Sequence, residues 1–172
     1  RNHGISKTLA SRFAKGKPWN YDIENPGYNY RLDEIRASLG INQIKRVKKM
    51  NLLRKKAANY YTEKLENVNG IVVPDKSIGA DHVHHLYVIR ITGKYSITRD
   101  MLFNKLLNKG IRTSVHYKPL HMFTAFKKMA KISGSLSNSK NTYSQILSLP
   151  IYPSISKRQQ NIVIRNIEKY EG

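Results

Sequence analysis

The chain has 172 residues, and its 31 Lys and Arg against 11 Asp and Glu give a formal net charge of +20. It is long enough to bury a hydrophobic core, has no cysteine for a disulfide or a thiolate metal site, and shows no apolar run near the roughly 20 residues of a membrane span. We therefore expect a soluble, cytoplasmic protein, and the start at Arg1 without a methionine leads us to expect a piece of a longer one.

The positive charge raises the hypothesis of a polyanionic partner such as nucleic acid. Residues 1–70 carry 15 Lys and Arg against 6 Asp and Glu, and residues 71–172 carry 16 against 5. Because the excess is spread along the chain, it favours a solvated basic surface over a dedicated basic arm. A nucleic-acid or polyanion-binding module stays open as an alternative function.

In chain order, residues 1–26 are rich in Gly, Pro, Asn and Lys, which predicts a surface loop with Trp19 and Tyr21 as anchors. From about residue 31 to 67, apolar positions recur with helical spacing and no proline interrupts them. Such a helix would be about 50 Å long at roughly 1.5 Å per residue. It is too long for one compact layer, so we expect it to connect two lobes.

The second half of the chain predicts a small α+β lobe. Strands are expected at 71–74, 82–92 and 111–117, where β-branched and aromatic residues gather. A helix is expected over 96–108, with Thr98 as its N-cap and Gly110 at its C-terminal stop; its apolar face would comprise Leu102, Leu106 and Leu107.

Beyond that helix, residues 133–142 predict a polar loop or a helix start, and a short LSLPIYP segment follows at 147–153. A last helix is expected to begin at Ser156 as its cap. Its buried side would comprise Ile162, Val163, Ile167 and Tyr170.

A glycine-containing loop at 27–31, GYNYR, leads into the long helix. Gly27 follows Pro26 and permits a tight turn, Asn29 offers neutral amide donors, and Arg31 offers a planar cationic fork. These donors suit a phosphate, and a helix N-terminus favours negative charge. The loop is either such an anion site or a capped helix start with two packed tyrosines, and the local pattern leaves both open.

Two further segments carry histidines. In the expected strand, His82 and His84 would share a face that His85 does not, so at most two of them would meet one ion. We therefore expect structural histidines and no metal site. Residues 113–121, TSVHYKPLH, place His116, Tyr117, Lys118 and His121 on a proline-stiffened loop. This donor set suits a diphosphate or a nucleotide, and an ordinary loop is the alternative.

Five segments in a consistent order carry a resemblance to a known family: RNHG at 1–4, WNYDIENPGYNYRLDEIRASLG at 19–40, HLYVIR at 85–90, GIRTSVHYKPLH at 110–121 and LSLPIYP at 147–153. Together they resemble the C-terminal half of the DegT/DnrJ/EryC1/StrS family. Members of that family are pyridoxal-phosphate-dependent aminotransferases that convert keto sugars on nucleotide carriers into amino sugars.

The resemblance implies an α/β fold, that of the fold type I pyridoxal-phosphate enzymes, in a homodimer with active sites at the subunit interface. It divides the chain into residues 1–45, the tail of the large cofactor-binding domain with the start of the connecting helix, and residues 46–172, the remainder of that helix with the small α+β domain. The amino donor is expected to be glutamate.

The resemblance also implies roles for single residues. Asn29 would reach the cofactor phosphate of the neighbouring subunit, with Arg31 near the same phosphate or the nucleotide. His116 and Tyr117 would contact the nucleotide-linked sugar, and His121 belongs to the same motif.

The family's Schiff-base lysine, and the carboxylate that pairs with the pyridine nitrogen, would precede Arg1. We therefore expect no catalytic residue in this chain and no transamination by it alone. A non-catalytic dimerisation remnant of the enzyme is the third alternative.

Overall fold

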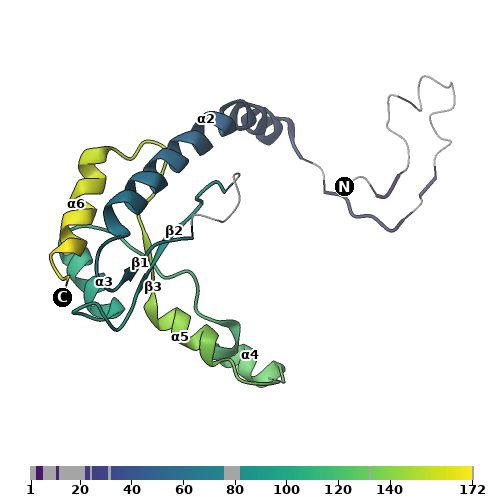
Figure 1. Ribbon diagram of the computed structural model, residues 1–172. Coiled ribbons are helices and arrows are strands. Elements are labelled where there is room, and N and C mark those ends of the chain that lie inside the picture. Colours follow the sequence, from purple (N-terminus) through teal and green to yellow (C-terminus); the bar gives the residue numbers. More distant parts are fainter. Residues whose placement is uncertain are drawn as a thin grey trace. The chain divides into compact units, whose positions relative to one another are not determined.

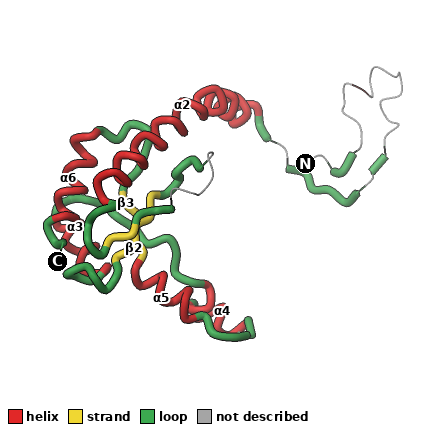
Figure 2. The backbone as a smooth tube through the Cα atoms, in the orientation of Figure 1, coloured by secondary structure: helices red, strands yellow, loops and turns green. Residues whose placement is uncertain are grey.

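The computed structural model describes residues 3–5, 11, 22–23, 25–30, 32–75, 82–131 and 133–171. The chain divides into two compact units, residues 1–46 and 47–172. Figures 1 and 2 show the elements of the described part, which are helices α2 (Glu34–Leu65), α3 (Arg99–Asn108), α4 (Thr124–Met129), α5 (Ser137–Gln145) and α6 (Lys157–Glu168), strands β1 (Ile71–Val72), β2 (Tyr87–Ile91) and β3 (Ile146–Leu149), and a 3₁₀ helix at Leu120–Met122.

The predicted long helix is confirmed as α2, which has 32 residues. It begins after Asp33, whose carboxylate accepts a hydrogen bond from the Arg36 backbone N–H at 2.9 Å and whose carbonyl accepts one from Ala37. Its buried residues lie in its last nine positions, whereas apolar residues nearer its start are exposed. None of the described helices is long and apolar enough to cross a membrane.

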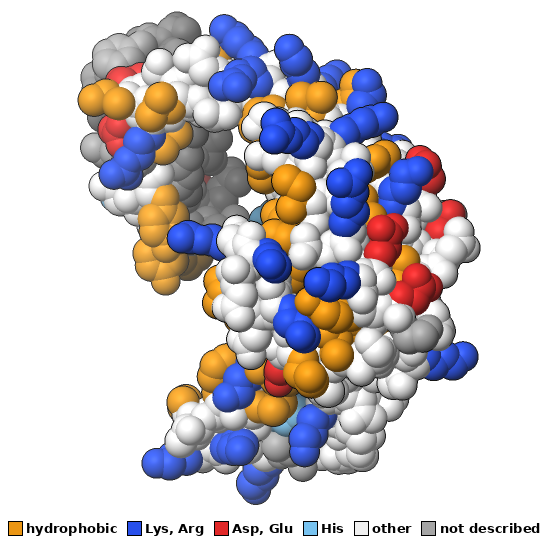
Figure 3. Space-filling model, turned by 90° about the vertical axis from the view of Figure 1, so that its left-hand side faces the viewer, with side chains coloured by type: hydrophobic (Ala, Val, Ile, Leu, Met, Phe, Trp, Pro, Cys, Tyr) orange, Lys and Arg blue, Asp and Glu red, His pale blue; other side chains and the backbone are white. Residues whose placement is uncertain are grey.

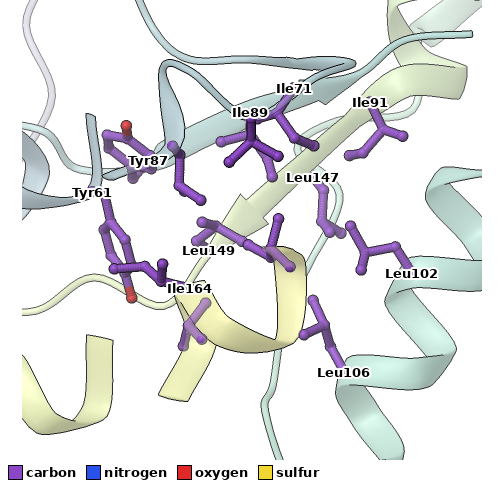
Figure 4. Packing of buried hydrophobic residues seen from close by; sticks show 14 of the residues in the cluster. Tyr61, Ile71, Tyr87, Ile89, Ile91, Leu102, Leu106, Leu147, Leu149 and Ile164 are labelled. Atoms are coloured by element: carbon purple, nitrogen blue, oxygen red, sulfur yellow. The ribbon is translucent and has the colours of Figure 1, made fainter. Parts of the chain in front are cut away.

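The second unit is built on an antiparallel three-stranded sheet of order β1-β2-β3. In its register Tyr87 lies opposite Leu149 and Ile89 opposite Leu147. Figure 4 shows side chains from α2, α3 and α6 meeting the sheet, among them Tyr61, Leu106 and Ile164. In Figure 1, α4 and α5 extend away from these three helices, and α5 leads directly into β3.

Burial of apolar side chains holds this unit together, since each large one contributes roughly 1.5–3 kcal/mol on leaving water. The largest fully buried side chains are Tyr61, Tyr87, Leu65, Ile89, Leu102, Leu106, Leu147 and Ile167. The tyrosine hydroxyls in the core find partners: that of Tyr61 donates to the Pro150 carbonyl at 3.1 Å, and that of Tyr95 donates to the Ile167 carbonyl at 2.6 Å. The core therefore buries these polar groups without leaving them unsatisfied.

Both predicted helix caps are confirmed. The Thr98 side chain accepts a hydrogen bond from the Met101 N–H, and Ser156 forms a reciprocal capping box with Gln159. Gly110 follows α3 with a φ of +72°, a left-handed conformation that favours glycine.

All three strand predictions differ from the structure. The 82–92 strand begins only at Tyr87, because the chain at His84 takes a φ of +47° that no strand accommodates. The expected strand at 111–117 is a loop with one isolated bridge between Ser114 and Ser148. The first strand is also shorter than expected and ends at Val72.

Two predictions of burial are wrong as well. Leu107 is 49% exposed and Ile162 is 46% exposed, because each is offset by one position from the buried stripe of its helix. Ile164, which the sequence analysis left out, is buried instead. The predictions for Trp19 and Tyr21 lie outside the described residues.

Candidate functional site

The loop that carries Asn29 is held by a second chain segment. The His3 N–H donates to the Tyr28 carbonyl at 3.2 Å, and Ile5 pairs with Ile23 in an antiparallel bridge. A Cβ at Gly27 would lie 2.2 Å from the Gly4 nitrogen, closer than real contacts allow. The two backbones therefore meet in a way that requires glycine at position 27.

In the sequence, Asn29 is flanked by Tyr28 and Tyr30, whose rings stack on each other. The rings of Tyr28 and Tyr30 have centroids 5.3 Å apart and planes 25° apart, and both side chains are exposed. Because alternate side chains of an extended segment share a side, Asn29 lies on the side opposite this pair. Its amide is exposed and makes no hydrogen bond to another described residue, so its donors are available to a phosphate.

The start of α2 is already occupied by a carboxylate. Asp33 accepts the Arg36 N–H and also lies 3.2 Å from the Arg36 guanidinium. The helix start is thus capped by the chain's own carboxylate, and the anion site at this loop stays a prediction. Arg31, the second predicted phosphate ligand, lies outside the described residues.

In the second unit, a backbone bridge places the loop that carries His116 against β3. Ser114 and Ser148 exchange two backbone hydrogen bonds, of 3.2 and 2.8 Å. Two residues further on, the Nδ1 atom of His116 lies 2.8 Å from the Oγ atom of Ser148, whose side chain is buried. The imidazole is thus fixed through Nδ1, which leaves Nε2 for a ligand.

Tyr117 is in contact with His116, their rings meeting edge to face at 4.7 Å, and it is 70% exposed. His121 follows in the 3₁₀ helix and is half-buried. Within the described part of the chain, no hydrogen bond or ring contact joins His121 to His116 or Tyr117. The structure therefore brings two of the three predicted substrate contacts together.

A cavity of about 370 Å³ lies beside this loop, and it is lined by Tyr117, Pro119, Asn138, Ser139, Thr142, Tyr143 and Ile146. Most of these residues belong to α5 or follow it. The sequence analysis missed the α5 residues because a polar helix that faces a loop leaves no periodic signal.

Arg99 fixes the junction between α5 and β3. Its Nη1 donates to the carbonyls of Tyr143 and Ile146 at 3.0 Å each, and the residue is 8% exposed. The guanidinium also lies 5.3 Å from the centre of the Tyr143 ring. This buried cation holds one wall of the cavity in place.

The three other histidines of interest lie in the loop before β2. The rings of His82 and His84 meet edge to face at 4.4 Å, and the His84 N–H donates to Nδ1 of His82. Burial, followed by the charges of His82 and Lys55, lowers the pKa of His84. Among the described residues, no three His, Cys, Asp or Glu side chains converge as metal ligands would.

Comparison with protein families places this geometry in context. The model of the DegT/DnrJ/EryC1/StrS aminotransferase family matches residues 1–168, which include both the Asn29 loop and the His116 loop. The chain belongs to the DegT/DnrJ/EryC1/StrS aminotransferase family. The resemblance inferred from the five segments is thereby confirmed.

Two similar proteins support the assignment to the DegT/DnrJ/EryC1/StrS family. The chain is 32% identical to the spore coat polysaccharide biosynthesis protein SpsC of Bacillus subtilis over 96% of this chain and 43% of that protein. It is 31% identical to the UDP-4-amino-4,6-dideoxy-N-acetyl-beta-L-altrosamine transaminase of Campylobacter jejuni over 95% of this chain and 41% of that protein. The chain thus spans less than half the length of these relatives.

A solved structure confirms the predicted α/β fold. The crystal structure of a DegT/DnrJ/EryC1/StrS aminotransferase from Brucella abortus matches with a TM-score of 0.75 and 30% identity, over 99% of this chain and 41% of that one. Over almost its whole length, the chain therefore has the fold of part of a family aminotransferase.

Proposed function

We propose that the chain is the C-terminal portion of a pyridoxal-phosphate-dependent aminotransferase that acts on nucleotide-linked keto sugars. The observation that carries the proposal is the family match over residues 1–168, which spans both predicted binding loops. The complete enzyme would transfer an amino group, from glutamate as the expected donor, to a keto sugar used in polysaccharide or glycan synthesis. We place the enzyme in the cytoplasm.

The surface of α2 supports the idea that more protein belongs with this chain. Ile35, Leu39 and Ile44 are 77%, 61% and 73% exposed on this helix. Large apolar side chains that recur in this way usually mark a surface that other protein covers. We propose that residues 1–45 belong to the large domain and that residues 46–172 complete the connecting helix and form the small domain.

The proposed cofactor is pyridoxal phosphate, on which aminotransferases of this family depend. When bound, it supplies the electron sink for transfer of the amino group. The exposed Asn29 amide fits its phosphate, because two N–H donors on a neutral group satisfy anionic oxygens. In the proposed homodimer, Asn29 and Arg31 hold the phosphate at the neighbouring subunit's site.

The proposed substrate contacts lie at the His116 loop. With Nδ1 engaged by Ser148, His116 presents Nε2 to a sugar or phosphate oxygen. The exposed Tyr117 adds a hydroxyl and an aromatic face. His121 remains a proposed contact of the same loop.

The distribution of charge supports a polyanion-binding module less well than the family match supports an aminotransferase. The Lys and Arg side chains on the face in Figure 3 are scattered among hydrophobic and uncharged ones. Dedicated nucleic-acid sites gather such charge on one face or one helix. We therefore keep the aminotransferase as the proposed function.

Titration of the ¹⁵N-labelled chain with a UDP-linked N-acetyl sugar, followed by NMR, tests the substrate contacts. We expect shifts centred on residues 114–121 and weaker binding by His116→Ala, while His85→Ala, an exposed histidine outside the site, leaves the affinity unchanged. Equal affinities for these two variants, or no response at residues 114–121, would contradict the proposal.

A further inference from the structure

The segment between the His116 loop and β3 forms a helical arm without a core of its own. This arm, residues 120–145, comprises the 3₁₀ helix at Leu120–Met122 together with α4 and α5. In Figure 1, α4 and α5 extend away from α2, α3 and α6. Among the described residues of the arm, none is buried. Its apolar side chains are therefore accessible to a partner.

The α4 part of the arm exposes apolar side chains along one side. Phe123, Phe126 and Met129 recur every third residue, a spacing that places them on neighbouring positions of a helix surface. They are 41%, 43% and 83% exposed. The rings of Phe123 and Phe126 meet edge to face with centroids 6.4 Å apart, so the exposed groups form a patch and are not isolated residues.

Lysines lie beside this apolar patch. Lys127 and Lys128 directly follow Phe126 in α4, and both are exposed. The Nζ atom of Lys118 lies 5.1 Å from the centre of the Phe123 ring. Aromatic and aliphatic groups beside lysines are typical of helices that lie in the interface of a lipid bilayer.

The sequence around the arm contains no acidic residue. Between Asp100 and Glu168 the chain has 11 Lys and Arg and no Asp or Glu, and no other acid-free stretch of the chain is half as long. The positive charge is spread along the chain, whereas negative charge is missing from this stretch, which contains the whole arm. An anionic surface would therefore meet attraction here that no carboxylate of the stretch opposes.

We propose that the helical arm docks on an anionic lipid surface, with Phe123, Phe126 and Met129 entering the headgroup region and the neighbouring lysines binding lipid phosphates. This inference goes beyond the proposed function and does not depend on it. Each lysine near such a surface strengthens binding by about fivefold, and inserted apolar groups add to this attraction.

The same observations favour a lipid surface over two other partners. A second copy of the chain that met the arm through the same face would bring like charges together. Nucleic acid would attract the lysines, but its phosphate backbone offers no apolar phase for the exposed Met129. A bilayer interface matches both the charge and the apolar patch.

Co-sedimentation of the 172-residue chain with vesicles tests the charge of the arm. Vesicles of phosphatidylcholine, with and without phosphatidylglycerol, are compared at about 0.15 M salt, where distant charges are screened. Lys127→Glu/Lys128→Glu should weaken binding to the anionic vesicles by at least about tenfold. The matched control is Lys48→Glu/Lys49→Glu, an exposed pair in α2 with the same change in net charge, which should cost less than about threefold.

A second pair of variants tests the apolar patch. Met129→Ser should weaken binding to the anionic vesicles by about three- to tenfold, because the side chain no longer leaves water on docking. Met101→Ser, at a position in α3 that is 48% exposed, should leave binding unchanged. Circular dichroism of each variant verifies that the helices are retained.

The chain's net charge of +20 attracts any anionic vesicle to some extent, so the matched variants decide the outcome. The inference is overturned if the two lysine pairs give equal losses, if Met129→Ser binds as Met101→Ser does, or if phosphatidylglycerol does not improve binding. Binding of duplex DNA that depends on Lys127 and Lys128, without vesicle binding, would assign the arm to nucleic acid instead. If neither vesicles nor DNA respond to the arm variants, the lipid surface is rejected and the patch is left to other protein.

Discussion

His116 and Ser148 are 32 residues apart in the chain, yet the Nδ1 atom of the histidine lies 2.8 Å from the Oγ atom of the serine. Ser148 is 4% exposed and belongs to β3, a strand whose four residues are all buried. The predicted substrate contact is thus fixed by a buried hydroxyl of the core and not by its own loop.

This relationship predicts that Ser148 positions His116. Ser148→Ala removes the partner of Nδ1, so the ring should lose its fixed orientation and nucleotide-sugar affinity should fall by about three- to tenfold. NMR of the ¹⁵N-labelled imidazole should show a changed balance of tautomers. Ser114→Ala is the control, because it keeps the backbone bridge to Ser148 while its side chain is exposed. If both variants give the same histidine spectrum and affinity, Ser148 has no such role.

A second prediction concerns the buried Arg99. Arg99→Met leaves the carbonyls of Tyr143 and Ile146 without their donor, so the free energy of unfolding should fall by about 2–4 kcal/mol. Urea unfolding measures this change. Arg158→Met, at an exposed position in the first turn of α6, should cost less than about 0.5 kcal/mol. A loss for Arg99→Met as small as for Arg158→Met would refute the role of Arg99 at this junction.

A third prediction concerns Gly27 and Gly40, which should respond in opposite ways to substitution by alanine. Gly27→Ala drives a Cβ into the Gly4 backbone, so the paired segments should separate and the His3 amide should exchange with solvent much faster. A Cβ at Gly40, in the second turn of α2, meets nothing within 4 Å, so Gly40→Ala should stabilise the helix by about 0.5–1 kcal/mol. Hydrogen exchange and circular dichroism measure the two effects. An unchanged His3 exchange rate in Gly27→Ala would disprove the close approach.

A fourth prediction is loss of stability in alkali. Burial raises the pKa of Tyr87 to about 12, and burial raises the pKa values of Tyr61 and Tyr95 as well. The unfolded chain ionises its tyrosines near pH 10, so this stability is fully present below pH 10 and is lost as the pH rises toward 12.

Urea unfolding at several pH values between 8 and 12 checks this dependence. Tyr87→Phe removes one titrating group and should make the fall in unfolding free energy less steep, although it also loses the hydrogen bond to Thr62. Tyr117→Phe, at an exposed position, should keep the slope of the natural chain. Equal slopes for Tyr87→Phe and Tyr117→Phe would argue against the effect of burial.

Local chemistry made several elements predictable from the sequence. Thr98 and Ser156 are caps because short hydroxyl side chains accept backbone N–H bonds at helix starts, and Gly110 ends its helix because it takes a positive φ. The length of α2 followed from uninterrupted helical spacing. These features depend on residues a few positions apart.

Features that depend on distant residues were not predictable. The residue pattern gave no sign that β3 would pair with Ser114 through a single bridge, or that Arg99 would bond to Tyr143 and Ile146. Leu107 was predicted to share the apolar face of its helix with Leu102 and Leu106, although adjacent helical residues point about 100° apart and Leu107 is exposed. The phosphate contact of Asn29 stays a prediction, whereas the hydrogen bond from the Arg36 N–H to Asp33 shows how the start of α2 is capped.

We propose that this chain supplies binding residues of a sugar aminotransferase and not its covalent lysine. Borohydride reduction of the chain with pyridoxal phosphate, followed by mass spectrometry, together with an assay of amino transfer to a nucleotide-linked keto sugar, tests it most directly. We predict scattered, substoichiometric modification of lysines and no turnover. Stoichiometric labelling of one lysine accompanied by turnover would contradict the account.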